Sequence, residues 1–110
     1  MSQGVKTIIY PVRDLAAAKA RFGELLGAEP TSDSPYYVGF TIDGQDIGLD
    51  PHGHQHGTTP YFHVDDVHGA LKQLVDAGAE VVQDVKDVGG GRLIAAVKDP
   101  DGNVVGLLQP

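Results

Sequence analysis

The feature that most limits the possible folds of this chain is an internal repeat. Residues 7–22, TIIYPVRDLAAAKARF, correspond in physical type to residues 59–74, TPYFHVDDVHGALKQL. In both copies a stretch rich in apolar residues runs into an aspartate, and a segment with helical periodicity follows. A repeated unit of this size buries its apolar surface by packing against its neighbour. We therefore expect two equivalent modules within a single domain formed by residues 1–110.

Each copy carries signals for the start and the end of a helix. Asp14 and Asp66 precede the periodic segments and suit the N-cap, where a carboxylate accepts hydrogen bonds from free backbone N–H groups. Apolar residues then recur at helical spacing, so each predicted helix has one apolar stripe. Gly27 and Gly78, each within the sequence Gly-Ala-Glu, favour a helix end.

Two strands joined by a tight turn are predicted near the end of each copy. Asp43-Gly44 lies between YYVGFTI and QDIGL, and Asp101-Gly102 lies between RLIAAVK and NVVGLL, which is a strong hairpin signal. Another strand is expected before each hairpin, weakly around residues 29–31 and more clearly over 80–85. Each copy therefore reads strand, helix and three strands.

The predicted fold class is α+β, with two βαβββ modules in tandem and a curved mixed sheet around a cleft. The first module spans residues 4–50, a linker rich in Gly, Pro and His spans 51–58, and the second module spans 59–110.

Composition and charge exclude several classes of function. The chain has no cysteine, which excludes disulfides and thiolate metal sites, so any metal site would need His, Asp or Glu. A net charge of −7 disfavours nucleic acid and anionic membrane surfaces and favours neutral or cationic ligands. No apolar stretch reaches membrane-spanning length, and the opening residues lack the pattern of a signal peptide. We expect a cytoplasmic protein that binds neither nucleic acid nor membranes.

The doubled βαβββ pattern, the Val-x-Asp that opens each helix and the phrase DPDGNVVGLLQP at residues 99–110 resemble the vicinal oxygen chelate superfamily. This group includes glyoxalase I, extradiol dioxygenases and bleomycin-resistance proteins. The resemblance implies a homodimer. It also implies a divalent metal held by a His or Gln that opens the first strand of each half and by a Glu on the last strand of each half.

Carried over to this sequence, those metal-ligand positions fall on Thr7 and Thr59, and on Gly48 and Gly106. A threonine hydroxyl binds divalent metals poorly and glycine has no side chain, so we predict no metal ion and no cofactor. The two glycines have two readings. They mark a bulge that helps the sheet to curl, or they let a ligand approach the backbone closely.

Strand alternation sorts the remaining side chains by face, with Thr7 and Thr59 taken to point into the cleft. Tyr37 and Tyr61 are candidates to stack on a flat ring or a cation, and Asp46 or Asp50 to answer a positive charge. The alternative is that these residues merely edge a solvated sheet. The predicted ligand-binding set is Thr7, Ile9, Tyr37, Thr41, Asp46, Gly48, Thr59, Tyr61, His63, Leu93, Ala95, Val97, Gly106 and Leu108.

Histidines are the remaining candidates for chemistry. His63 is the predicted catalytic residue, as a hydrogen-bond partner or general base, because a histidine titrates near physiological pH. His52, His54 and His56 alternate along the linker, where three imidazoles can bind Zn, Ni or Cu, or can simply be polar residues of a linker.

Three functions follow as hypotheses. The first is a metal-independent binding protein that resembles bleomycin-resistance proteins and sequesters a neutral or cationic, partly aromatic small molecule. The second is a glyoxalase-like lyase or isomerase, or a dioxygenase-type enzyme, that uses His63 as a base or a non-standard metal site. The third is an interaction module whose function lies in its dimer surface and whose cleft is vestigial, which a cleft filled by its own side chains would favour.

Overall fold

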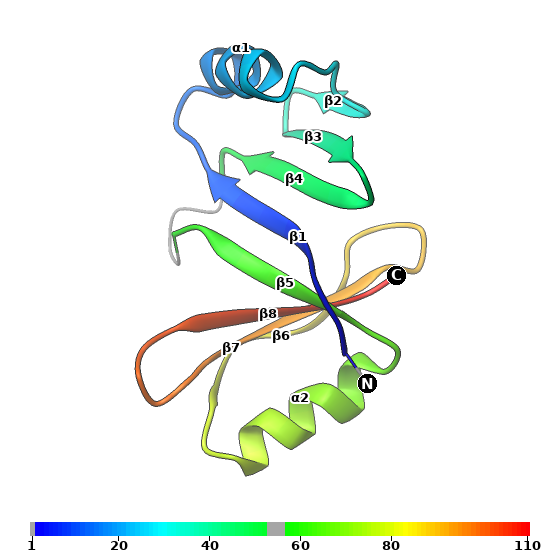
Figure 1. The fold of residues 1–110 in the computed structure, drawn as a ribbon. Helices are drawn as coiled ribbons and strands as arrows, with labels where there is room; N and C mark the ends of the chain where they lie inside the picture. The colour runs from blue at the N-terminus through cyan, green and yellow to red at the C-terminus, as the bar shows by residue number, and fades with distance from the viewer. Residues whose placement is uncertain (1, 53–56) are drawn as a thin grey trace. The chain divides into compact units, whose positions relative to one another are not determined.

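A computed structural model describes residues 2–52 and 57–110 (Figure 1). Within these residues, no helix has the length and apolar character needed to cross a membrane. The first half holds β1 (Ser2–Pro11), α1 (Leu15–Leu26), β2 (Ser32–Ser34), β3 (Tyr37–Ile42) and β4 (Gln45–Asp50). The second half holds β5 (Thr59–Val64), α2 (Val67–Asp76), β6 (Glu80–Asp87), β7 (Leu93–Lys98) and β8 (Val104–Gln109).

This order is βαβββ twice, as the repeat predicts, with the second strand of the first half at Ser32–Ser34 rather than at 29–31. The chain divides into an N-terminal unit, Thr7–Thr59, and a C-terminal unit, residues 2–6 and 60–110. The start of β1 thus groups with the C-terminal unit, where Gln3 Nε2 donates to Asp65 Oδ1 at 3.4 Å.

The two units have the same strand topology. In the N-terminal unit the order is β2-β3-β4-β1, and in the C-terminal unit it is β6-β7-β8-β5. In each, the first strand pairs in parallel with the last, and the remaining neighbours pair antiparallel. The predicted α+β class and the duplication are confirmed.

Both helices begin as the sequence predicts. The Asp14 side chain accepts a hydrogen bond from the Ala17 N–H at 3.0 Å, and the Asp66 side chain accepts one from the Gly69 N–H at 3.2 Å. Helix α1 ends at Gly27, whose φ of 64° is a conformation that glycine adopts at little cost. Each N-cap satisfies an N–H group that the helix itself leaves free.

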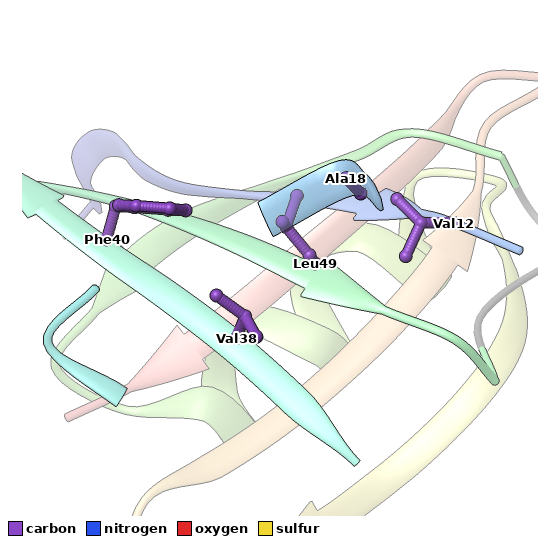
Figure 2. Close-up of a cluster of buried hydrophobic side chains, with 5 residues drawn as sticks. All are labelled: Val12, Ala18, Val38, Phe40 and Leu49. Carbon is purple, nitrogen blue, oxygen red and sulfur yellow. The ribbon is translucent and has the colours of Figure 1, made fainter. Parts of the chain in front are cut away.

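The core of the N-terminal unit lies between α1 and the sheet. Its buried members are Val12, Ala18, Val38, Phe40 and Leu49, drawn in Figure 2. Partly buried Tyr10 and Phe22 extend it, with ring centroids 5.0 Å apart. Burial of each large side chain stabilises the fold by about 1.5–3 kcal/mol, which makes this packing the main force that holds α1 on its sheet.

The core of the C-terminal unit lies between α2 and its own sheet. Val64, Val67, Ala95 and Leu107 are buried there. Partly buried side chains pack around them: Phe62, Ala70, Leu71, Leu74, Val85 and Leu93. Helix α2 packs against β6, β7 and β8.

The two predicted hairpins form, but their connections differ. Asp43 and Gly44 have φ values of 49° and 80° and connect the paired residues Ile42 and Gln45, which is a two-residue turn with the expected positive φ angles. In the second hairpin the last pair is Lys98 and Val104, so the loop has five residues rather than the predicted two.

The Asp99 carboxylate holds this longer loop. Its Oδ1 accepts hydrogen bonds from the N–H groups of Asp101 and Asn103 at 3.0 and 2.8 Å, and its Oδ2 accepts one from Asn103 Nδ2 at 3.1 Å. These bonds hold the pKa of Asp99 below its usual range, chiefly through the backbone N–H of Asn103. The ionised side chain thus accepts hydrogen bonds from backbone N–H groups of the loop. With a two-residue turn, part of this backbone would belong to the strands instead.

Candidate functional site

In each unit one face of the sheet carries the helix, and we call the other the helix-free face. In the N-terminal unit two rows of paired residues cross this face. Thr7 pairs with Asp46, which pairs with Thr41, and Ile9 pairs with Gly48, which pairs with Gly39. Since Val38, Phe40 and Leu49 face α1, these alternate residues point away from it. The predicted residues Thr7, Ile9, Tyr37, Thr41, Asp46 and Gly48 therefore share one face.

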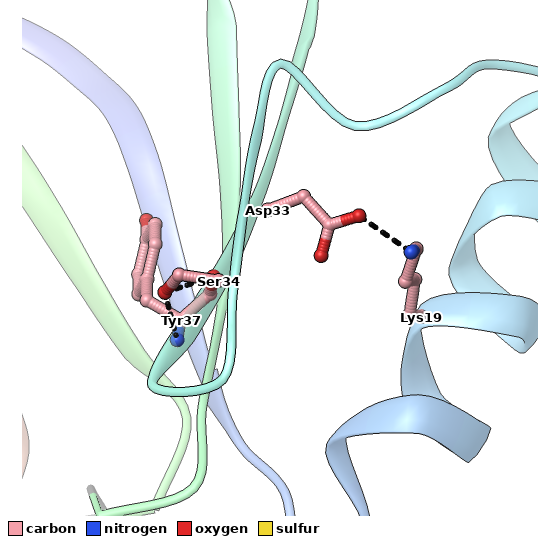
Figure 3. A network of polar contacts seen from close by, with 4 residues as sticks. All are labelled: Lys19, Asp33, Ser34 and Tyr37. Carbon is pink, nitrogen blue, oxygen red and sulfur yellow. Dashed lines mark hydrogen bonds and ion pairs between the residues drawn. The ribbon is translucent and has the colours of Figure 1, made fainter.

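The space above Gly48 is taken by Tyr37. A Cβ atom built on Gly48 would collide with the Tyr37 hydroxyl and with the δ-methyl group of Ile9, and one built on Gly39 would lie 3.1 Å from Tyr37 Cε2. Figure 3 shows the ring on the side of the strands away from α1, whereas Asp33 points toward Lys19 on that helix. Two glycines thus allow the Tyr37 ring to lie close to the sheet.

A short chain of hydrogen bonds runs beside this ring. Thr41 Oγ1 donates to Asp46 Oδ1 at 2.9 Å, and the hydroxyl groups of Thr31 and Thr41 are 3.2 Å apart. Asp46 is half-buried and Thr41 is exposed. The helix-free face of the N-terminal unit therefore presents a carboxylate oriented by a hydroxyl, next to an aromatic ring.

In the C-terminal unit the equivalent row is Tyr61, Gly106 and Ala96, and the next row is His63, Leu108 and Ile94. A Cβ atom on Gly106 would lie 2.5 to 2.7 Å from three atoms of the Tyr61 ring. The ring therefore rests on the glycine. Although Tyr37 and Tyr61 come from different strands of the repeat, each covers the glycine of the last strand in its own unit.

His63 is 8% exposed and lies in the row next to Tyr61, paired with Leu108. Every buried polar side-chain atom of the described residues has a hydrogen-bond partner. The predicted catalytic histidine is therefore a buried residue on the same face as the Tyr61 ring.

The structure corrects the predicted face of three residues of β7. Leu93 and Ala95 pack in the core against α2, and Val97, two residues further along the strand, shares their face. A two-residue turn at Asp101-Gly102 would pair Gly106 with Val97. The five-residue loop pairs it with Ala96 instead. A shift of one residue moves every side chain of a strand to the other face.

Ile94 and Ala96 therefore take the places that we predicted for Leu93, Ala95 and Val97. Gly39 and Thr31 were also missed. The sequence contains one signal for the longer loop. Asp99 and Pro100 precede Asp101-Gly102, and a proline lacks the N–H that a strand residue donates.

Of the two readings of the glycines, the bulge is wrong. Strands β4 and β8 keep an unbroken register through Gly48 and Gly106, so there is no bulge at either position. Close approach does occur, but the group that approaches is the chain's own tyrosine ring.

The residues at the four implied metal-ligand positions do not fit a divalent metal. Gly48 and Gly106 offer no donor, and a longer side chain at either would meet a tyrosine ring. Thr7 and Thr59 are buried, and Thr59 Oγ1 donates to the carbonyl of Gly57 at 3.1 Å. In the part of the chain that the structure describes, no three His, Asp or Glu residues cluster as metal ligands. His52 is exposed, and His54 and His56 lie outside the described residues.

Several solved structures have a similar fold. Methylmalonyl-CoA epimerase from Mycobacterium tuberculosis is 16% identical with a TM-score of 0.78, over 99% of this chain and 89% of that chain. A glyoxalase/bleomycin resistance protein/dioxygenase superfamily member from Vibrio splendidus 12B01 is 19% identical with a TM-score of 0.71, over 99% and 98%. At such low sequence identities, this structural similarity shows only that the fold is shared.

A third structure is the Mn(II)-bound glyoxalase from Novosphingobium aromaticivorans, 19% identical with a TM-score of 0.75, over 99% of this chain and 40% of that chain. No curated protein matches the chain in sequence. Residues 4–107 match the family described as the Glyoxalase/Bleomycin resistance protein/Dioxygenase superfamily. The chain therefore belongs to this superfamily, as its doubled modules and its DPDGN loop indicate.

Proposed function

We propose that this protein binds a neutral or cationic, partly aromatic small molecule without a metal ion, and acts by sequestering it. The observation that carries the proposal is the pair of tyrosine rings, Tyr37 and Tyr61, each backed by a glycine at a position where the family resemblance implies a glutamate. Both tyrosines are partly exposed. A partly exposed aromatic ring can stack on a planar ligand.

Charge supports the same class of ligand. The chain has a net charge of −7, and the Asp46 carboxylate lies on the same face as Tyr37. An aromatic ring beside a carboxylate favours a ligand that combines a flat ring with a positive charge, since stacking and cation–π contacts each contribute about 0.5–1.5 kcal/mol.

Titration of the full chain tests this proposal. The panel consists of basic glycopeptide antibiotics and planar aromatic cations. Binding is measured by isothermal titration calorimetry and by tyrosine fluorescence, which is not masked because the chain has no tryptophan. For a ligand that binds, Tyr37→Leu or Tyr61→Leu should weaken binding about tenfold, because one stacking surface is lost.

Tyr36→Leu is the matched control. Tyr36 is 71% exposed, is adjacent in sequence to Tyr37, and should be replaceable without effect on affinity. The absence of heat across the whole panel, or an affinity unchanged in both the Tyr37 and the Tyr61 variant, would contradict the proposal.

A second candidate function is catalysis with His63 as general base, favoured by the burial of this histidine in the row beside Tyr61. The test is exchange of an acidic carbon-bound proton of methylmalonyl-CoA in D₂O, followed by NMR. If the wild type catalyses this exchange and a folded His63→Gln variant does not, the protein is an enzyme and not a binding protein.

A further inference from the structure

On the helix side of the C-terminal unit a hollow of about 420 Å³ lies between α2 and the strands β5 and β8. Its walls are mostly apolar, formed by Phe62, Val64 and Leu107 of the sheet and by Ala70 and Leu74 of the helix. All of these side chains belong to the C-terminal unit and to the side of the sheet opposite Tyr61. The hollow is therefore distinct from the tyrosine-bearing face.

The internal repeat shows what kind of group this space accepts. In the alignment of the two copies, Phe62 corresponds to Tyr10, Ala70 to Ala18, and Leu74 to Phe22. In the N-terminal unit the Phe22 ring packs on Tyr10 and Ala18 is completely buried. In the C-terminal unit Leu74 supplies no ring and Ala70 stays partly exposed. The hollow thus lies where the sister module holds an aromatic ring.

The rim of the hollow is polar and acidic. Asp66, Gly69 and Gln73 line it together with the apolar residues. One oxygen of the Asp66 carboxylate accepts a hydrogen bond from the Gly69 N–H at 3.2 Å. A carboxylate has about four acceptor sites, so this capping bond leaves capacity for a donor from a ligand.

We propose that this hollow is a binding site for a small arylalkyl ammonium ion. The aromatic ring enters between Phe62 and Leu74, as the Phe22 ring does against Tyr10 in the other module, and the ammonium group donates to Asp66 at the rim. The net charge of −7 favours a cation at this position. The site is separate from the one under the proposed function and does not depend on it.

The test uses the full chain labelled with ¹⁵N and titrated with 2-phenylethylammonium chloride. We expect saturable amide shifts at Gly69, Ala70, Gln73 and Leu74, with a dissociation constant of about 1 mM, in the range expected for a ligand of about nine non-hydrogen atoms. Shifts confined to the surroundings of Gly48 or Gly106, or no saturable shift, would overturn the proposal.

Two pairs of matched comparisons separate shape from charge. Leu74→Phe fills the hollow with the ring of the sister module and should weaken binding at least about tenfold, whereas Val75→Phe, which adds the same ring one position along the helix, should not. Affinity in Leu74→Phe equal to that of the wild type would overturn the proposal.

Asp66→Asn keeps a good N-cap residue and removes the charge. This variant should bind the ammonium ion about three- to tenfold more weakly than the wild type, and its affinity for the neutral 2-phenylethanol should be unchanged. This second variant keeps the proposal testable even if Leu74→Phe does not fold, and an equal loss for both ligands would contradict the role given to the carboxylate.

Discussion

At the scale of single residues, Gly106 is constrained by the ring of Tyr61 and not by its own backbone conformation. Its φ angle is not among the positive values that favour glycine, so the backbone accepts alanine there. The obstacle is the ring, which lies 2.5 to 2.7 Å from the place of the absent Cβ. The same holds at Gly48, where Tyr37 and Ile9 are the obstacles.

We predict that Gly106→Ala destabilises the protein by about 1–3 kcal/mol, because the added methyl group overpacks the contact with Tyr61. This exceeds the gain of about 0.5–1 kcal/mol that alanine brings to a strand relative to glycine. Urea unfolding followed by circular dichroism measures the free energy of unfolding.

The control is a double-mutant cycle with Tyr61→Ala. Without the ring, Gly106→Ala should be neutral or stabilising. An equal loss of stability in both backgrounds would show that the glycine is needed for some other reason than the tyrosine.

At the scale of elements, the loop of residues 99–103 sets the register of the second hairpin. The Asp99 carboxylate organises this loop through three hydrogen bonds. The resulting pairing of Ala96 with Gly106 determines which side chains of β7 enter the core and which lie beside Tyr61. One ionised side chain thus affects the composition of both faces of the sheet.

The depressed pKa of Asp99 predicts a pH dependence of stability. Because the folded-state pKa is lower than the unfolded value of about 4, the contribution of Asp99 is fully present above that value and is lost as the pH falls through the folded pKa. We expect the melting temperature of the wild type to fall more steeply on acidification below about pH 5 than that of Asp99→Asn.

Asp101→Asn, in the same loop, is the matched control and should keep the slope of the wild type. Thermal melts across the acid range provide the measurement. Parallel curves for the wild type and Asp99→Asn would mean that this carboxylate does not contribute through its charge.

At the scale of the whole molecule, the chain has the fold of a superfamily that includes metal enzymes, but the residues at the implied ligand positions do not suit a metal. We predict that untagged protein, dialysed after incubation with Mn(II), Zn(II) or Ni(II), retains well below one equivalent of metal. Elemental analysis by mass spectrometry measures this.

His63→Ala provides the comparison for that experiment. Stoichiometric metal that survives dialysis and is lost in this variant would establish a non-standard metal site and favour the enzyme over the binding protein. The homodimer remains a prediction, which light scattering of the purified chain checks.

The sequence by itself determined the duplication, the two N-caps and the first turn. These features depend on periodicity and on contacts within a few residues, so they can be predicted from the order of the residues alone. The predicted faces of Thr41, Asp46 and Tyr61 were also right. Thr41 and Asp46 lie on either side of a regular two-residue turn, and Tyr61 lies in a strand that follows the alternation of the repeat.

The tertiary structure decided the rest, because it depends on which residues of separate strands face one another. The five-residue loop moved Leu93, Ala95 and Val97 to the helix side, and no local pattern in β7 distinguishes its two apolar faces. The placement of Tyr37 and Tyr61 on glycines of other strands likewise follows from register and packing across the sheet. A glycine in the sequence shows only that a side chain is missing, whereas the structure shows what occupies its space.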